Sequence, residues 1–112
     1  MLEALWSMRV HVNSAPVNAG GVVIIENGRI FGGDSSFIWT GTVHIKDEIA
    51  TARVHVKKYQ DVPGMTSITG LNDYMATFRG QVNHDRMTLV GSPDTAPQAQ
   101  LHIEMIRRAE LP

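Results

Sequence analysis

Hydrophobic and polar residues alternate along most of the chain, and short clusters of turn residues separate the alternating runs. A period of two is typical of strands that bury one face, and no stretch keeps a 3.6-residue helical period over ten residues. The clearest run is residues 49–59, where small and branched apolar residues alternate with polar ones. The predicted strands are residues 5–12, 20–26, 29–31, 37–46, 49–59, 74–82, 86–91 and 98–105.

The connections between these runs are mostly short. Asn27-Gly28 predicts a two-residue hairpin with a type I′ turn, because both of its central residues need positive φ. Asp47-Glu48 is an equally tight connection. Gly32-Gly33 predicts a kink or bulge where the sheet bends sharply.

Eight antiparallel strands without a covering helix must split into a sandwich or close on themselves. Short sequential connections favour closure. We therefore expect an all-β fold, an eight-stranded antiparallel up-and-down barrel, as one domain spanning residues 1–112. The interior of such a barrel is either filled by its own side chains or holds one small ligand.

Side-chain volume on the predicted inward face favours an apolar ligand cavity, although the same residues also suit an ordinary core. Small residues leave room near the axis, namely Gly41, Gly80, Gly91, Ala50, Ala52, Ala76 and Ala99. Four aromatic residues fill part of it, namely Trp6, Phe31, Trp39 and Phe78. The predicted cavity lining is Trp6, Met8, Val10, Trp39, Val54, Phe78, Leu89, Leu101 and Ile103.

Several large apolar residues fall on the outward face of the predicted strands. Scattered singly on a surface they need no explanation, but clustered on adjacent strands they form an interface patch. We expect them to form a homodimer interface. The residues are Val22, Ile24, Ile38, Met75 and Val90.

Composition narrows the classes of partner and compartment. The 112 residues carry 10 Lys plus Arg and 11 Asp plus Glu, which gives a net charge of −1. Non-specific binding of nucleic acid or anionic membranes needs an excess of clustered cations, so we do not expect it. The absence of cysteine excludes disulfides and thiolate chemistry and favours a reducing compartment. Apolar runs are too short to span a bilayer, and we expect no signal peptide. The expected location is cytoplasmic.

Candidate chemistry is sparse. The five histidines fall on outward strand faces or in a turn, and none forms an HxH or HxxxH pair that would suggest a zinc site. The acidic residues lie almost entirely at turns and strand ends, where Asp bonds the nearby backbone. No G-x-S-x-G elbow or phosphate-binding loop occurs. We expect no catalytic residue, metal or cofactor.

Residues 26–41 resemble the GrlR-like family of negative regulators of type III secretion. The shared features are Asn27-Gly28, then Gly32-Gly33-Asp34, then the aromatic Trp39 two positions before Gly41. The resemblance continues weakly through Val54-His55-Val56 and Tyr59, and it extends over about 40 residues.

This resemblance implies a lipocalin-like homodimeric barrel in bacteria, without catalysis, which binds a transcriptional activator and blocks its DNA binding. It also implies a hydrophobic cavity for a lipid-like molecule. In that family, consecutive acids in a turn between strands contact the activator, and the matching acids here are Asp47 and Glu48, preceded by Lys46. The alternative function is a small intracellular barrel that carries or senses an apolar ligand.

Overall fold

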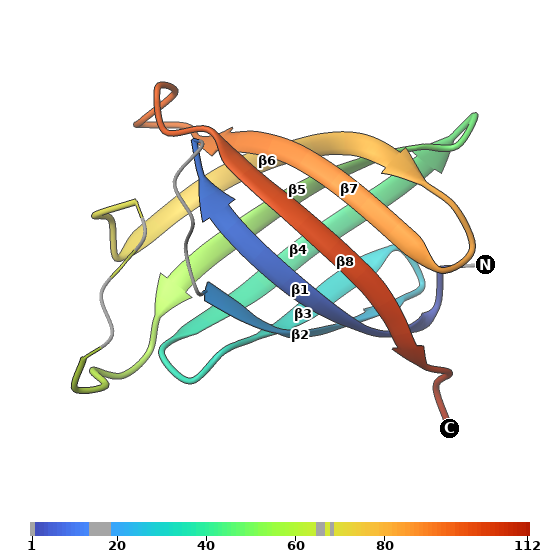
Figure 1. Ribbon diagram of the computed structural model, residues 1–112, viewed down its shortest axis with the longest axis horizontal. Coiled ribbons are helices and arrows are strands. Elements are labelled where there is room, and N and C mark those ends of the chain that lie inside the picture. Colours follow the sequence, from blue (N-terminus) through green and yellow to red (C-terminus); the bar gives the residue numbers. More distant parts are fainter. Residues whose placement is uncertain (1, 14–18, 65–66, 68) are drawn as a thin grey trace.

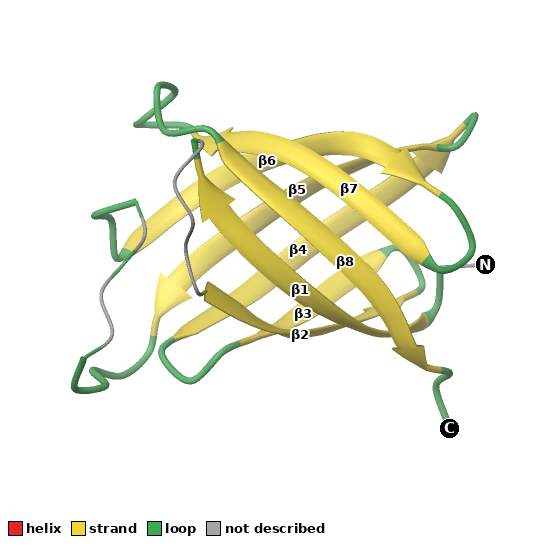
Figure 2. Ribbon diagram, viewed as in Figure 1, coloured by secondary structure: helices red, strands yellow, loops and turns green. Residues whose placement is uncertain are grey.

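The chain folds into a closed antiparallel β-barrel (Figure 1; Figure 2). The computed structural model describes residues 2–13, 19–64, 67 and 69–112. The strands are β1 (Ala4–Val12), β2 (Ala19–Glu26), β3 (Arg29–Gly33), β4 (Phe37–Lys46), β5 (Ile49–Lys58), β6 (Asp73–Val82), β7 (Arg86–Pro93) and β8 (Leu101–Ala109). The predicted fold class is confirmed, with most strand ends within two residues of the prediction.

Each strand pairs with the next along the chain, and β1 pairs with β8 to complete the circle. Closure satisfies the backbone hydrogen bonds that a free sheet edge would leave exposed. In the part of the chain that the structure describes, no helix has the length and apolar character needed to cross a membrane.

Two hairpins at one end of the barrel have left-handed turn residues. Asn27 and Gly28 have φ values of 53° and 73°, which confirms the predicted turn between β2 and β3. Asp47 and Glu48, between β4 and β5, have φ values of 54° and 66°. Positive φ at both central positions is typical of a type I′ turn, which matches the twist of the strands that it joins.

The two adjacent glycines of β3 bend the strand through their backbone dihedral angles, without the extra residue of a β-bulge. Gly32 and Gly33 have φ values of +152° and +145°, and their pairing with β2 and β4 continues without a shift of register. The predicted kink therefore takes the form of positive φ without an inserted bulge residue. After these glycines, Asp34 Oδ1 accepts hydrogen bonds from the backbone N–H groups of Ser36 and Phe37, at 2.8 and 2.7 Å. These bonds shape the turn into β4.

The barrel interior is one apolar cluster built from alternate residues of the strands. Two inward placements predicted from the sequence are wrong. Ile30, opposite the buried Ile25, faces inward, and Phe31 pairs with Ile24 on the outer face, 36% exposed. Ala99 belongs to the turn before β8, where its N–H donates to the Ala96 carbonyl, because β8 begins at Leu101.

Candidate binding site

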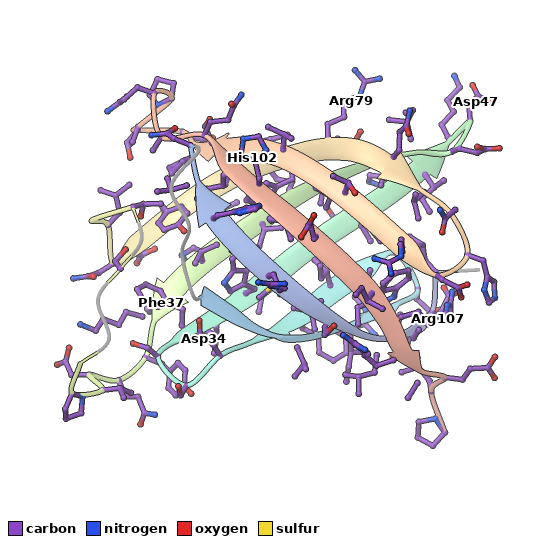
Figure 3. The ribbon with its side chains drawn as sticks, viewed as in Figure 1. Asp34, Phe37, Asp47, Arg79, His102 and Arg107 are labelled. Carbon is purple, nitrogen blue, oxygen red and sulfur yellow. The ribbon has the colours of Figure 1, made fainter. Side chains whose placement is uncertain are left out.

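The turn between β4 and β5 projects two acids into solvent. Asp47 and Glu48 are both exposed, and Figure 3 shows Asp47 at the tip of this hairpin. Within the described residues neither carboxylate has an ion-pair partner. The N–H of Val82 donates to the Glu48 carbonyl at 3.0 Å, which ties the turn to the end of β6. The backbone thus holds both acids in place while their charges remain available.

A hollow of about 360 Å³ lies beside this acidic turn, on the side of the β6–β7 hairpin. Its lining is mostly polar and includes both acids and one cation. The lining residues are Asp47, Glu48, Ile49, Gln81, Val82, Asn83, Arg86 and Thr88. The turn therefore stands at the edge of a concave polar surface.

A larger pocket of about 550 Å³ opens at the same end of the barrel. Its walls come from the chain before β1, from the ends of β2, β4 and β6, and from the three hairpin turns at this end. The lining residues are Leu2, Glu3, Ile25, Gly28, Val43, Ile45, Glu48, Val82, Asn83 and His84. Its volume falls within the range of about 300–1,000 Å³ that is usual for small-molecule sites.

Ile45 shows that this end of the barrel is open. It pairs with the buried Ala50 and shares the inward face of β4 with Val43, which is only 4% exposed. Ile45 is nevertheless 45% exposed. An inward apolar side chain with this much exposure has no core packed over it, so the pocket offers an apolar wall to solvent.

The rim of the pocket is fixed by contacts between segments far apart in sequence. The Glu3 carboxylate accepts a hydrogen bond from the N–H of Asn27 at 3.3 Å. Arg107 of β8 donates from Nε to the His84 carbonyl at 2.7 Å and from Nη1 to the Glu3 carbonyl at 3.3 Å. Its guanidinium carbon also lies 5.2 Å from the ring centroid of Trp6, a cation–π contact. Figure 3 shows Arg107 at this end of the barrel.

The nine residues predicted to line a cavity along the axis are all buried in the core cluster. None of them lines the pocket at the barrel end. Trp39 and Phe78 stack with their ring centroids 5.8 Å apart and their planes at 15°. Because these rings fill space beside small residues, the open apolar volume described above lies beyond them, at the end of the barrel.

The five predicted interface residues do not form one patch. Val22 and Ile38 both lie opposite Gly33, so they flank a position without a side chain. Ile24 lies beside them on β2 and pairs with Phe31, which the prediction had omitted from this face. We call the group Val22, Ile24, Phe31 and Ile38 the outer apolar patch.

The other two predicted interface residues are half-buried on a different side of the barrel. Met75 of β6 pairs with His55, and Val90 of β7 pairs with both Arg79 and His102. Polar neighbours therefore surround them. Met75 and Val90 could share an interface with the outer apolar patch only if the partner wrapped around the barrel.

The histidines remain on the outside. His11 and His102 pair across β1 and β8 with ring centroids 5.8 Å apart and perpendicular planes. His55 and His84 each contact an aspartate, Asp73 at 2.5 Å and Asp85 at 2.8 Å respectively. Among the residues that the structure describes, no three His, Asp or Glu side chains gather as a metal ion would require.

Shifted pKa values occur away from the acidic turn. A bidentate bond to Arg53 lowers the pKa of Asp94, with Nη1–Oδ1 and Nη2–Oδ2 distances of 2.7 and 2.6 Å. Burial raises the pKa of Tyr74. Asp94 and Tyr74 lie toward the opposite end of the barrel, because β7 ends and β6 begins there. These groups stabilise loops and strand ends, and none of them faces the pocket.

Sequence reasoning singled out Glu48 as an acid that contacts a protein partner, and it did not predict Glu3, Ile45, Glu48 or His84 as lining of a ligand pocket. A signal for Ile45 was present, since the inward alternation of β4 continues to the last residues before the acidic turn. Glu3 and His84 carried no such signal, because their place in the pocket depends on closure between β1 and β8. No protein-family model matches this sequence, and the comparison with curated proteins finds no match either.

Proposed function

We propose that this protein is a non-enzymatic regulatory protein, which sequesters a transcriptional activator through contact with Asp47 and Glu48. The observation that carries the proposal is the exposed acidic turn, whose two carboxylates have no ion-pair partner among the described residues. Activators bind DNA through clustered cations. Two acids held on such a turn can form ion pairs with those cations and so block DNA binding.

The geometry of the turn supports this role. Both residues have positive φ and their hairpin is paired along its whole length, so little conformational entropy is lost when a partner binds. Each exposed ion pair contributes only about 0–1 kcal/mol, so the acids mainly steer and orient the partner. The adjacent hollow supplies a surface on which the partner's side chains can pack.

The proposed active form is a homodimer joined through the outer apolar patch. Val22 and Ile38 are 50% and 41% exposed, and their burial against a second copy would remove apolar surface from water. A two-fold axis places the same patch on both subunits. The acidic turn lies at the end of β4, away from Ile38 near the start of that strand, and so stays accessible.

The test is capture of a DNA-binding partner from the native host by the tagged protein. The double variant Asp47→Lys/Glu48→Lys is expected to lose a basic DNA-binding protein that the wild type retains. The matched control is Glu104→Lys/Glu110→Lys, which makes the same change in net charge at exposed acids of β8 and the C-terminal residues. Equal capture by wild type and the turn variant would contradict the proposal.

A second candidate function is favoured by the pocket at the barrel end. In this alternative the protein carries or senses an apolar, lipid-like molecule. The observation behind it is a 550 Å³ pocket whose wall includes the exposed inward side chain of Ile45. Uptake of an apolar probe by the purified protein tests it, and a protein that binds no such probe would exclude it.

A further inference from the structure

Two carboxylates from different segments line the pocket at the barrel end. Glu3 precedes β1, and Glu48 lies between β4 and β5. The Glu3 carboxylate reaches the β2–β3 turn, where it accepts a hydrogen bond from the N–H of Asn27, and Glu48 belongs to the β4–β5 turn, two strands further round the barrel. The two acids therefore belong to different segments of the pocket wall, which also contains apolar side chains.

The charges at the pocket are mostly negative. Among the described residues no Lys or Arg lines it, and the His84 ring contacts the Asp85 carboxylate at 2.8 Å. Arg107 at the rim keeps its positive charge, because its Nε and Nη1 donate to neutral backbone carbonyls and its guanidinium lies over the neutral ring of Trp6. The two carboxylates of Glu3 and Glu48 outnumber this guanidinium, so the pocket presents an excess of negative charge to a ligand.

The depth of the pocket is apolar. Its apolar lining residues are Leu2, Ile25, Val43, Ile45 and Val82. Ile25 and Val43 are buried and form the inner wall, whereas Ile45 is nearly half exposed. An alkyl chain seated here would cover Ile45 and leave its polar end at the level of the two acids.

We propose that the pocket binds a single-chain amphipathic cation, with the alkyl chain against Ile45 and the ammonium group beside Glu3 and Glu48. This inference rests on the second candidate function, and it specifies the charge of the ligand. An anionic headgroup of the same length would meet two like charges. Partial removal of water by the alkyl chain strengthens both the attraction and the repulsion.

Three probes with the same chain test the proposal: decylammonium, decanoate and decanol, each kept below the concentration at which it forms micelles. Binding is measured by isothermal titration calorimetry at low salt. We expect decylammonium to bind at least about tenfold more tightly than decanoate, a factor that corresponds to one modest Coulomb interaction. Added salt is expected to reduce this preference.

Variants assign the preference to the two acids. Glu48→Gln is expected to reduce decylammonium affinity severalfold and to leave decanol binding unchanged, and Glu3→Gln/Glu48→Gln is expected to abolish the preference for the cation. Glu104→Gln, on the outer face of β8, is the control and is expected to behave as wild type. Because Glu3 also accepts a backbone hydrogen bond, far-UV circular dichroism checks that each variant is folded.

The outcomes distinguish failure of ligand binding from failure of the inference about the charge of the ligand. If none of the three probes binds, the ligand-binding function itself fails. If decanol or decanoate binds as tightly as decylammonium, the pocket binds apolar chains without regard to charge, and the inference about a cation is overturned while ligand binding stands. A cation preference that survives the double substitution would also overturn it, because the acids would not be its source.

Discussion

The ring of Phe78 occupies the space that a side chain at Gly91 would need. The two residues pair directly across β6 and β7, and a Cβ atom at Gly91 would lie 2.6 Å from Cδ1 of Phe78. The backbone carbonyl of Thr77 lies closer still to that position. Glycine at this position therefore leaves room inside the barrel for the aromatic ring of Phe78.

Replacement of Gly91 should strain the core. We expect Gly91→Ala to lower the free energy of unfolding by about 1–3 kcal/mol, because the added methyl group forces Phe78 or the Thr77 backbone to move. Urea denaturation measures the effect. Thr88→Ala, at an exposed position of the same strand, is the control and should change stability by less than about 0.5 kcal/mol. Equal effects of the two substitutions would disprove the overpacking argument.

The residues of the acidic turn should make the fold less stable than other turn residues would, while they provide the binding contact. Asp47 and Glu48 both have positive φ, a conformation that Asn and Gly adopt at lower cost, as they do in the turn at Asn27-Gly28. The variant Asp47→Asn/Glu48→Gly is therefore expected to raise the free energy of unfolding by about 1 kcal/mol. It should also weaken binding of the captured partner. Thermal denaturation and repeat capture measure the two effects, and a more stable variant with unchanged binding would refute the functional half.

The Arg53–Asp94 pair predicts loss of stability at acidic pH. Arg53 lowers the pKa of Asp94 in the folded state, so the pair stabilises the fold at pH values above the unfolded pKa near 3.8. That contribution disappears as the pH falls through the lowered pKa. Both side chains are exposed, so the effect should be small and should weaken with salt. Urea midpoints of wild type and Asp94→Asn between pH 2 and 7 test this, and parallel pH profiles would count against it.

Tyr74 predicts the opposite behaviour at alkaline pH. Its pKa is raised above 10.0, first by burial, so the folded state holds the neutral phenol when the unfolded chain has begun to ionise. Stability is therefore fully present below pH 10 and is lost as the pH rises through the folded pKa. Tyr74→Phe should flatten this alkaline decline, as followed by urea denaturation from pH 8 to 11. An identical decline in the variant would show that other groups cause it.

The homodimer proposal depends on the outer apolar patch. Val22→Lys/Ile38→Lys places charges on both sides of Gly33 and should convert a dimer into a monomer, as measured by sedimentation equilibrium. Met75→Lys, which lies among polar residues on another side of the barrel, should leave the dimer intact. Dissociation by Met75→Lys, with the patch variant still dimeric, would assign the interface to a different face.

Local rules predicted most of the strands and turns, although β8 begins three residues later than predicted. Alternation at Ala50, Ala52 and Val54 fixed the inward face of β5, and Asn27-Gly28 fixed a two-residue hairpin. That same hairpin requires Ile24 to pair with Phe31, so the inward placement of Phe31 conflicted with the outward placement of Ile24. The register set by a turn decides such a conflict, because directly opposite residues share a face.

The candidate site was less predictable because it depends on distant segments. The count of small inward residues suggested a cavity along the axis, but that argument had no information on how Trp39 of β4 and Phe78 of β6 stack inside the barrel. The pocket at the barrel end is assembled from the first residues of the chain and three turns. Periodicity carries no information about which turns meet once the barrel closes.

The central claim is that the acidic turn displaces an activator from its DNA. Its most direct measurement is fluorescence anisotropy of a labelled DNA site bound by the captured partner, during titration with this protein. The wild type and Glu104→Lys/Glu110→Lys are predicted to release the DNA to the same extent, and Asp47→Lys/Glu48→Lys is predicted to leave it bound. Release of the DNA by the turn variant at the wild-type concentration would contradict the account.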